Sequence, residues 1–187
     1  FNKIRFMFCL SVLILTNCEK RQIDWNDEEE IRQITSESIN FNLLKKITKK
    51  ETSFYSQSNS SKPYTGWVKT TFSDGKRKSL FHMENGMIEG QMTIWNDLGN
   101  LKEQIFYLSG RKNGKFAWFD DYNQKLEEGF YKNDLLHGSS IIWTTKGVVR
   151  EKGNYKNGKR HGEWIFYDLD GKEWNRIKYI NGVTAEN

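Results

Sequence analysis

The sequence predicts an all-β protein, a single-layer twisted antiparallel meander of about five 24-residue hairpin repeats that follows a short N-terminal helical segment. Three observations predict this fold. Glycines recur at one fixed interval, aromatic and β-branched residues fill the stretches between them, and only one proline occurs in 187 residues. Glycines at a single period are typical of a repeat array. Apolar stretches of this kind between glycine turns favour strands joined as hairpins.

Residues 1–17 have the pattern of a lipoprotein signal peptide. Lys3 and Arg5 precede an apolar run that extends from Phe6 to Leu15. A positive start followed by a short apolar run is typical of an export signal, and ten residues are too few to span about 30 Å of hydrocarbon as a helix. The segment is therefore expected to direct export and then to be removed.

The end of this segment, residues 15–18, resembles the bacterial lipobox. The resemblance implies that Cys18 becomes the lipid-modified first residue of the mature protein. The alternative is a cleavable signal without a lipid, which would leave a plain thiol at Cys18. Since Cys9 would be removed with the signal, neither a disulfide framework nor a cysteine metal site is expected.

Residues 18–62 are predicted to be a tether that contains an amphipathic helix. Asn26 or Asp27 would cap the helix, and the acids that follow suit its first turn. The helix is expected as one piece or as two pieces broken near residues 38–42, with residues 56–62 as a flexible link. It would cover one face of the sheet, with contact to a membrane surface as the alternative. The apolar positions near a helical period are Ile31, Ile34, Phe41, Leu44 and Ile47. Four lysines lie at the end of this stretch, where positive charge suits a helix, at positions 45, 46, 49 and 50.

Residues 63–187 form the predicted repeat domain, in which three series of positions share the 24-residue spacing. Asn123 and Asp134 stand in two of these series where the other members are glycines, because both residues tolerate left-handed backbone conformations. The first series is expected to supply structural turn glycines, and it consists of Gly66, Gly90, Gly114, Gly138 and Gly162. The second consists of Gly75, Gly99, Asn123, Gly147 and Gly171, and the third of Gly86, Gly110, Asp134, Gly158 and Gly182.

Two columns of aromatic residues follow from the same period and form the candidate binding face. In a meander one repeat position returns after two strands, so the rings of one column lie roughly 10 Å apart, with other side chains between them. Tyrosine and tryptophan on a rigid sheet suit binding to a protein or stacking on sugars; packing against each other and the helix is the structural alternative. The columns are Trp95, Phe119, Trp143 and Tyr167, and Tyr107, Tyr131, Tyr155 and Tyr179.

The stretches "PYTGWVKTTFSDGKRKSLFHMENGMIEGQMTIW" at 63–95 and "YKNGKRHGEWIFYDLDGK" at 155–172 resemble the bacterial variant of the MORN repeat in YwqK-type proteins, often labelled antitoxins. The resemblance covers Tyr64 to Thr184 and departs from the usual glycine at Asn123 and Asp134. It implies a twisted single-layer sheet of hairpins that acts as a protein-binding or scaffolding element. It supplies no catalytic residues.

The residues that could carry chemistry are better explained by turns. His137 and His161 lie one repeat apart, roughly 10 Å in a meander, whereas two histidines that share one metal ion each lie about 2 Å from it. Asp120, Asp121, Asp168 and Asp170 flank predicted turns, where aspartate bonds its own backbone. A net charge of +5 without a basic cluster does not indicate a nucleic-acid surface. We expect no enzyme activity, no metal and no cofactor.

The sequence therefore predicts a lipoprotein of the bacterial cell envelope, on its periplasmic or surface side, held at a membrane by a lipid on Cys18. Its repeat sheet would bind or scaffold an unidentified protein partner. One alternative is a glycan-binding or glycan-modifying envelope protein, since flat rings stack on sugars. Another is a YwqK-type antitoxin, which would act in the cytoplasm.

Overall fold

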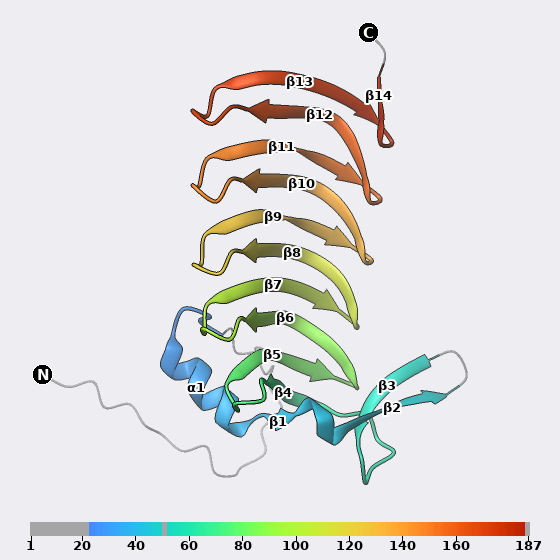
Figure 1. The fold of residues 1–187 in the computed structure, drawn as a ribbon. Coiled ribbons are helices and arrows are strands. Elements are labelled where there is room, and N and C mark those ends of the chain that lie inside the picture. Colours follow the sequence, from blue (N-terminus) through green and yellow to red (C-terminus); the bar gives the residue numbers. More distant parts are fainter. Residues whose placement is uncertain (1–22, 50–51, 186–187) are drawn as a thin grey trace, which may run out of the picture.

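The computed structural model describes residues 23–49 and 52–185, and within them most residues belong to one long sheet. Its strands follow one another in sequence order from β4 to β14, and each pairs antiparallel with the next (Figure 1). The short strand β1 (Ile39–Asn40) lies parallel to β4 at one edge. The predicted all-β meander with a short N-terminal helix is confirmed.

The strands of this sheet form five consecutive hairpin units and a short final strand. They are β4 (Gly66–Thr71), β5 (Arg77–Glu84), β6 (Met87–Trp95), β7 (Leu101–Leu108), β8 (Arg111–Phe119), β9 (Lys125–Lys132), β10 (Leu135–Trp143), β11 (Val149–Lys156), β12 (Lys159–Tyr167), β13 (Glu173–Ile180) and β14 (Val183–Thr184).

The second and third periodic series lie in the turns between strands. Asn123 (φ 65°) and Asp134 (φ 69°) adopt the left-handed conformation that glycines adopt elsewhere in their series. Asn157 and Gly158, with φ of 52° and 81°, form the two-residue turn between β11 and β12. Left-handed conformations at both central residues suit the right-handed twist of the flanking strands.

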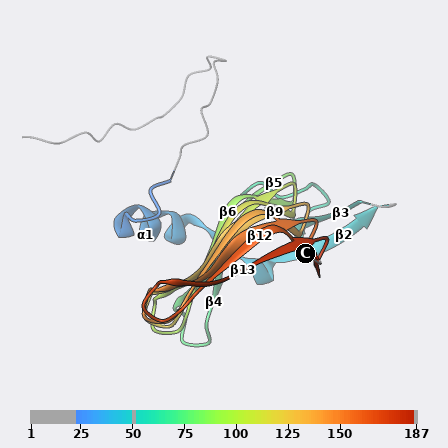
Figure 2. The same cartoon turned by 90° about the horizontal axis from the view of Figure 1, so that it is seen from above.

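The first periodic series lies in strands rather than in turns, which corrects the prediction made from the sequence. Gly138, for example, lies within β10 with φ 91°. Leu136 pairs with Tyr131 and Ser140 pairs with Gly129, so β10 carries more residues than β9 between the same two pairs. Such bulges bend a strand and increase its twist. Figure 2, seen along the stack, shows the strands overlying one another with a gradual rotation.

Helix α1 (Glu28–Glu37) begins at the predicted cap. The Asp27 carboxylate accepts hydrogen bonds from the backbone N–H groups of Glu29 and Glu30 at 2.9 and 3.1 Å. Acidic residues in the first turn are stabilised by the helix dipole. Ile31 and Ile34 are buried on the side of α1 that packs against the sheet.

The second half of the predicted helix is wrong. After Ser38 the chain forms β1, a short 3-10 turn (Phe41–Leu43), and a separate hairpin of β2 (Leu44–Lys49) and β3 (Thr52–Gln57). The apolar residues Phe41, Leu44 and Tyr55 pack on the sheet in this arrangement. Contact with the sheet thus decided between the helix and the strands, since the same apolar spacing is compatible with both.

The predicted flexible link at residues 56–62 is also wrong. Ser56 is fully buried within β3, and its hydroxyl donates hydrogen bonds toward the carbonyls of Ser60 (2.9 Å) and Lys62 (2.7 Å). Tyr55 N–H also donates to the Gly86 carbonyl at 2.8 Å, which joins the hairpin to the turn after β5. The segment is therefore fixed against the first repeat.

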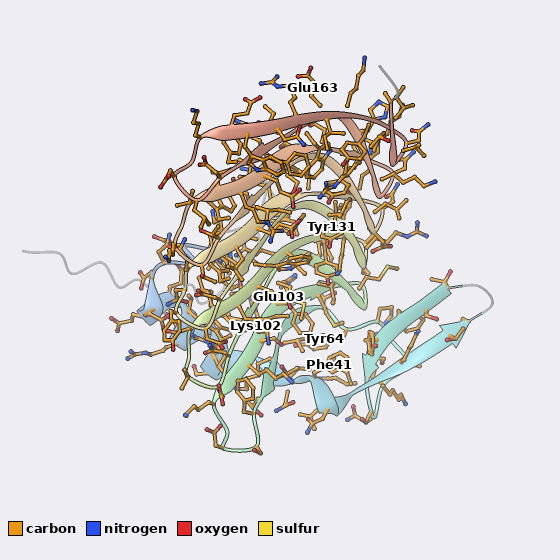
Figure 3. The ribbon with its side chains drawn as sticks, turned by 45° about the horizontal axis from the view of Figure 1, so that its top comes forward. Phe41, Tyr64, Lys102, Glu103, Tyr131 and Glu163 are labelled. Carbon is orange, nitrogen blue, oxygen red and sulfur yellow. The ribbon has the colours of Figure 1, made fainter. Side chains whose placement is uncertain are left out.

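The N-terminal segments cover both faces of the sheet at one end (Figure 1). We call the face that carries Tyr107, Tyr131, Tyr155 and Tyr179 the tyrosine face, and the other the helix face. On the helix face α1 packs over Leu80 and Trp95, and on the tyrosine face the β2–β3 hairpin packs over Phe81 and its neighbours. Figure 3 shows Phe41 and Tyr64 at this end and Tyr131 farther along the sheet.

No element of the described chain packs over the tyrosine face from β8 to β13. None of the helices in this part of the chain has the length and apolar character that crossing a membrane requires.

Trp95 on β6 and Trp143 on β10 occupy the same repeat position, but only Trp95 lies beneath α1, so they make a matched pair. Trp95 is 3 % exposed beneath α1, and Trp95→Ala is expected to lower the free energy of unfolding by about 3–5 kcal/mol. Trp143 is only half-buried, and Trp143→Ala is expected to cost less than about 2 kcal/mol. Urea denaturation followed by circular dichroism measures both; equal losses would contradict the assignment of Trp95 to the core.

Candidate binding face

The tyrosines of the second aromatic column share one row on the tyrosine face. Tyr131 pairs with Gly114 on one neighbouring strand and with Leu136 on the other, and the next repeat places Tyr155 between Gly138 and Arg160. The bulge glycines leave room beside each ring on one side. On the other side each tyrosine pairs with a larger side chain of the next strand. The row therefore alternates tyrosine with Lys112, Leu136 and Arg160.

The first aromatic column lies on the opposite face, so the eight candidate rings do not make one surface. Trp118 pairs with Glu127 on the tyrosine face, and Phe119, the next residue, faces the other way. Trp95 is buried under α1 and is removed from the candidates. On the helix face the Nζ of Lys125 lies 5.8 Å from the centre of the Trp143 ring, and that of Lys152 lies 5.3 Å from the Tyr167 ring.

Phe116 and Trp164 belong to a central row of side chains on the tyrosine face. They are 2 % and 0 % exposed, although no second layer of the described chain covers them. Each ring lies on the backbone of a neighbouring strand: a Cβ on Gly129 would come within 2.9 Å of Phe116, and a Cβ on Gly153 would clash with the ring of Trp164. Sequence reasoning missed these glycines because both fall outside the three periodic series. Their separation of 24 residues was the signal that could have revealed them.

A row of acids, also missed from the sequence, runs beside this central row. Glu103, Glu127 and Glu151 recur at the same 24-residue spacing. They alternate on the tyrosine face with larger side chains of the strands between them, such as Trp118 and Ile142. The repeat period would have revealed this row, but not the face on which it lies.

Glu151 is held by two arginines. It is 6 % exposed, and its carboxylate accepts hydrogen bonds from Arg160 at 2.6 Å and from Arg150 at 3.1 Å. The Arg160 guanidinium also lies 4.0 Å from the centre of the Trp164 ring and 5.7 Å from that of Phe166. Burial by itself would lower the pKa of Arg160, but the charge of Glu151 and the neighbouring tyrosine hydroxyls outweigh it and raise that pKa.

Glu127, one repeat earlier, has no such partner. Within residues 23–49 and 52–185, no ion pair joins it to a cation, and its carboxylate accepts a hydrogen bond from the Ser140 hydroxyl at 3.4 Å. Burial raises the pKa of the Glu127 carboxyl and the charge of Glu151 adds to the increase, whereas Ser140 and Arg150 oppose it. The carboxyl lines an open depression of about 480 Å³ together with Trp118, Leu126, Ile142 and Arg150.

Two of the aspartates singled out for chemistry have local structural roles. The Asp120 carboxylate accepts hydrogen bonds from the N–H groups of Tyr122 and Gln124, each at 2.9 Å, within one turn. Asp168 accepts from the N–H groups of Asp170 and Lys172 in the equivalent turn, at 3.0 and 2.8 Å. The described residues contain no group of three or more histidine, cysteine or acidic residues placed to hold a metal ion. Cys18 lies outside the described residues.

Glu127 and Glu151 are expected to respond in opposite ways to replacement by glutamine. Because the pKa of Glu127 is raised in the folded protein, ionisation disfavours folding above that pKa, and Glu127→Gln is expected to increase stability at neutral pH. The gain should vanish as the pH falls below the ordinary glutamate range, where both states are protonated. Glu151→Gln removes the partner of two arginines and is expected to cost about 1–3 kcal/mol at neutral pH. Urea denaturation between pH 3 and 8 measures both; a loss of stability in Glu127→Gln at pH 7 would contradict the assignment.

No protein-family model matches this chain, and no curated protein matches its sequence. Among solved structures, the crystal structure of TarM is similar with a TM-score of 0.31 and 12% identity, over 70% of this chain and 24% of that chain. The crystal structure of a GtfA/B complex bound to UDP and GlcNAc is similar with a TM-score of 0.25 and 12% identity, over 72% of this chain and 24% of that one. The chain thus spans about a quarter of either neighbour, and similarity at this level assigns no function.

Proposed function

We propose that this protein is a lipid-anchored envelope protein whose tyrosine face, from β8 to β13, binds a protein partner. The observation that carries the proposal is the uncovered row of half-buried tyrosines beside alternating acids and large apolar side chains. Tyrosine, tryptophan and arginine are the residue types that contribute most to protein interfaces, because they combine large contact areas with polar groups. The strands hold these side chains in a fixed array, so little conformational freedom is lost on binding.

The membrane anchor is supported by the lipobox-like residues 15–18 and by the short apolar run before them. A lipid on Cys18 would hold the sheet near a membrane through the segment that precedes α1. One acyl chain gives only marginal membrane binding, so stable attachment needs more than one chain or a second contact.

Replacement of Cys18 tests the anchor. The full chain is expected to remain with membranes after an alkaline carbonate wash, which removes proteins held by other proteins, and mass spectrometry should find a lipid on Cys18. Cys18→Ala should release the protein from the washed membranes. Cys9→Ala, a change within the predicted signal, is the matched control and should leave the lipid in place. An unmodified thiol at Cys18 in the mature protein would refute the anchor.

Crosslinking from two adjacent residues tests the binding face. Phe166 and Ile165 are neighbours on β12, both half-buried, and they face opposite sides of the sheet. A photoreactive phenylalanine analogue at position 166 is expected to give a protease-sensitive crosslinked product in intact cells, and the same analogue at 165 should give little. Equal products at both positions would contradict the assignment of the face. A product at 166 that resists protease and is degraded by glycan hydrolases would show that the partner is a glycan and not a protein.

A further inference from the structure

Three positions of the repeat on the tyrosine face vary together. The first precedes the acid, the second is the acid itself, and the third is the residue on the next strand that pairs with the following tyrosine. The repeat around Glu103 carries Lys102 and Lys112 at the outer two positions. The repeat around Glu151 carries two arginines, and the repeat between them carries Leu126 and Leu136 with Glu127. The middle repeat thus keeps its acid and has lost both cations.

The Glu151 repeat shows how this surface holds a guanidinium group. Arg160 extends from β12 to the Glu151 carboxylate on β11, and the contact of 2.6 Å is charge-assisted. Its flat guanidinium lies over the ring of Trp164, 4.0 Å from the ring centre. A guanidinium is suited to such a site because it combines planar hydrogen bonding to a carboxylate with stacking on a ring.

The Glu127 repeat has the same carboxylate but an empty space before it. Ser140 stands where Trp164 stands one repeat later, and Leu136 stands where Arg160 stands. Ser140 contacts the Glu127 carboxylate at 3.4 Å, and on another side Glu127 lines the depression of about 480 Å³ together with Leu126 and Ile142. The indole of Trp118 lines the same depression, so a ring is available beside the carboxylate. Arg150 lies at the border, but its guanidinium is already paired with Glu151 at 3.1 Å.

We propose that the depression at Glu127 binds the guanidinium of an arginine side chain of the partner protein, with the guanidinium paired to the Glu127 carboxylate and stacked on Trp118. This inference rests on the proposed function, because it names the chemistry by which the tyrosine face recognises its partner. The occupant follows from charge complementarity and from the arginine that the chain itself places on Glu151. A lysine would form the ion pair but would lose the planar stacking and the paired hydrogen bonds.

An arginine introduced into the chain tests whether the site accepts this group. Leu136→Arg places a guanidinium at the position equivalent to Arg160 and is expected to lower the pKa of Glu127, because a nearby positive charge favours the carboxylate. Carbon-13 NMR titration of the Glu127 carboxyl in the full chain measures the shift. Leu136→Met, which keeps an apolar side chain of similar volume, is the control and should leave the titration midpoint unchanged. An unchanged midpoint in Leu136→Arg would overturn the proposal.

Binding of a small probe tests recognition from solution. Titration of the full chain with N-acetyl-arginine amide is expected to shift the NMR signals of the Glu127 carboxyl and the Trp118 indole N–H. N-acetyl-lysine amide should bind at least about threefold more weakly, because it cannot stack as a plane. Both Glu127→Gln and Leu136→Arg should abolish the arginine response. Equal responses to the two probes, or an arginine response that persists in Glu127→Gln, would overturn the proposal.

The crosslink from position 166 separates failure of this proposal from failure of the proposed function. If the partner supplies an arginine, Leu136→Arg and Glu127→Gln should each reduce the protease-sensitive crosslinked product at least about fivefold, since such central charged contacts dominate interfaces. Leu136→Met should leave the product unchanged. A product that persists in both variants would refute the arginine and retain the binding face. Absence of the product in the unchanged chain would refute the binding face, and the probe titration would then decide the site by itself.

Discussion

The packing of large rings onto strand glycines is the interaction on which this sheet depends. A single-layer sheet has no second layer to bury its apolar side chains, and a ring that stood upright would remain in water. Gly153 and Gly129 leave the backbone bare, so that Trp164 and Phe116 lie flat on the neighbouring strands and become almost fully buried. The Trp164 indole N–H also reaches the Asn154 carbonyl at 3.0 Å, which satisfies its polar group. These two repeats thus each make a small core with the neighbouring strand, and contacts between neighbouring repeats are typical of repeat proteins.

The first repeats are stabilised differently, because the chain before them wraps around the edge. Strand β1 pairs with β4, and the Lys69 ammonium donates to the Thr35 carbonyl at the end of α1 at 2.7 Å. An uncovered edge strand would present free backbone groups to other chains. The cover also brings Trp95 and Phe81 into two ordinary cores on opposite faces. The uncovered part of the tyrosine face is therefore confined to the later repeats by the packing of the N-terminal segments.

The differences among repeats give the open face its chemistry. The period repeats an acid on the tyrosine face, but its neighbours vary, and the variation sets the electrostatic state of each carboxylate. Two arginines hold Glu151, whereas Glu127 contacts the Ser140 hydroxyl and lines a depression beside Trp118, Leu126 and Ile142. Because a half-buried carboxylate without a cation is disfavoured in the free protein, a cationic partner gains more from pairing with Glu127 than with an exposed acid. A regular fold can in this way carry one distinct site without any change of backbone.

The sequence by itself determined the fold class, the 24-residue period and the start of the helix at Asn26 or Asp27, between which the structure selected Asp27. Glycine, asparagine and aspartate are the residues that take up left-handed backbone conformations most readily, so their spacing specifies where the chain turns or bulges before any contact is known. The tertiary structure alone decided which residues share a face, because each bulge adds residues to one strand and changes the alternation, as at Gly138. It also decided the state of residues 39–57, whose apolar spacing suits a helix as well as strands. Contact of Phe41, Leu44 and Tyr55 with the sheet selected the hairpin, since burial outweighs the small differences in local propensity.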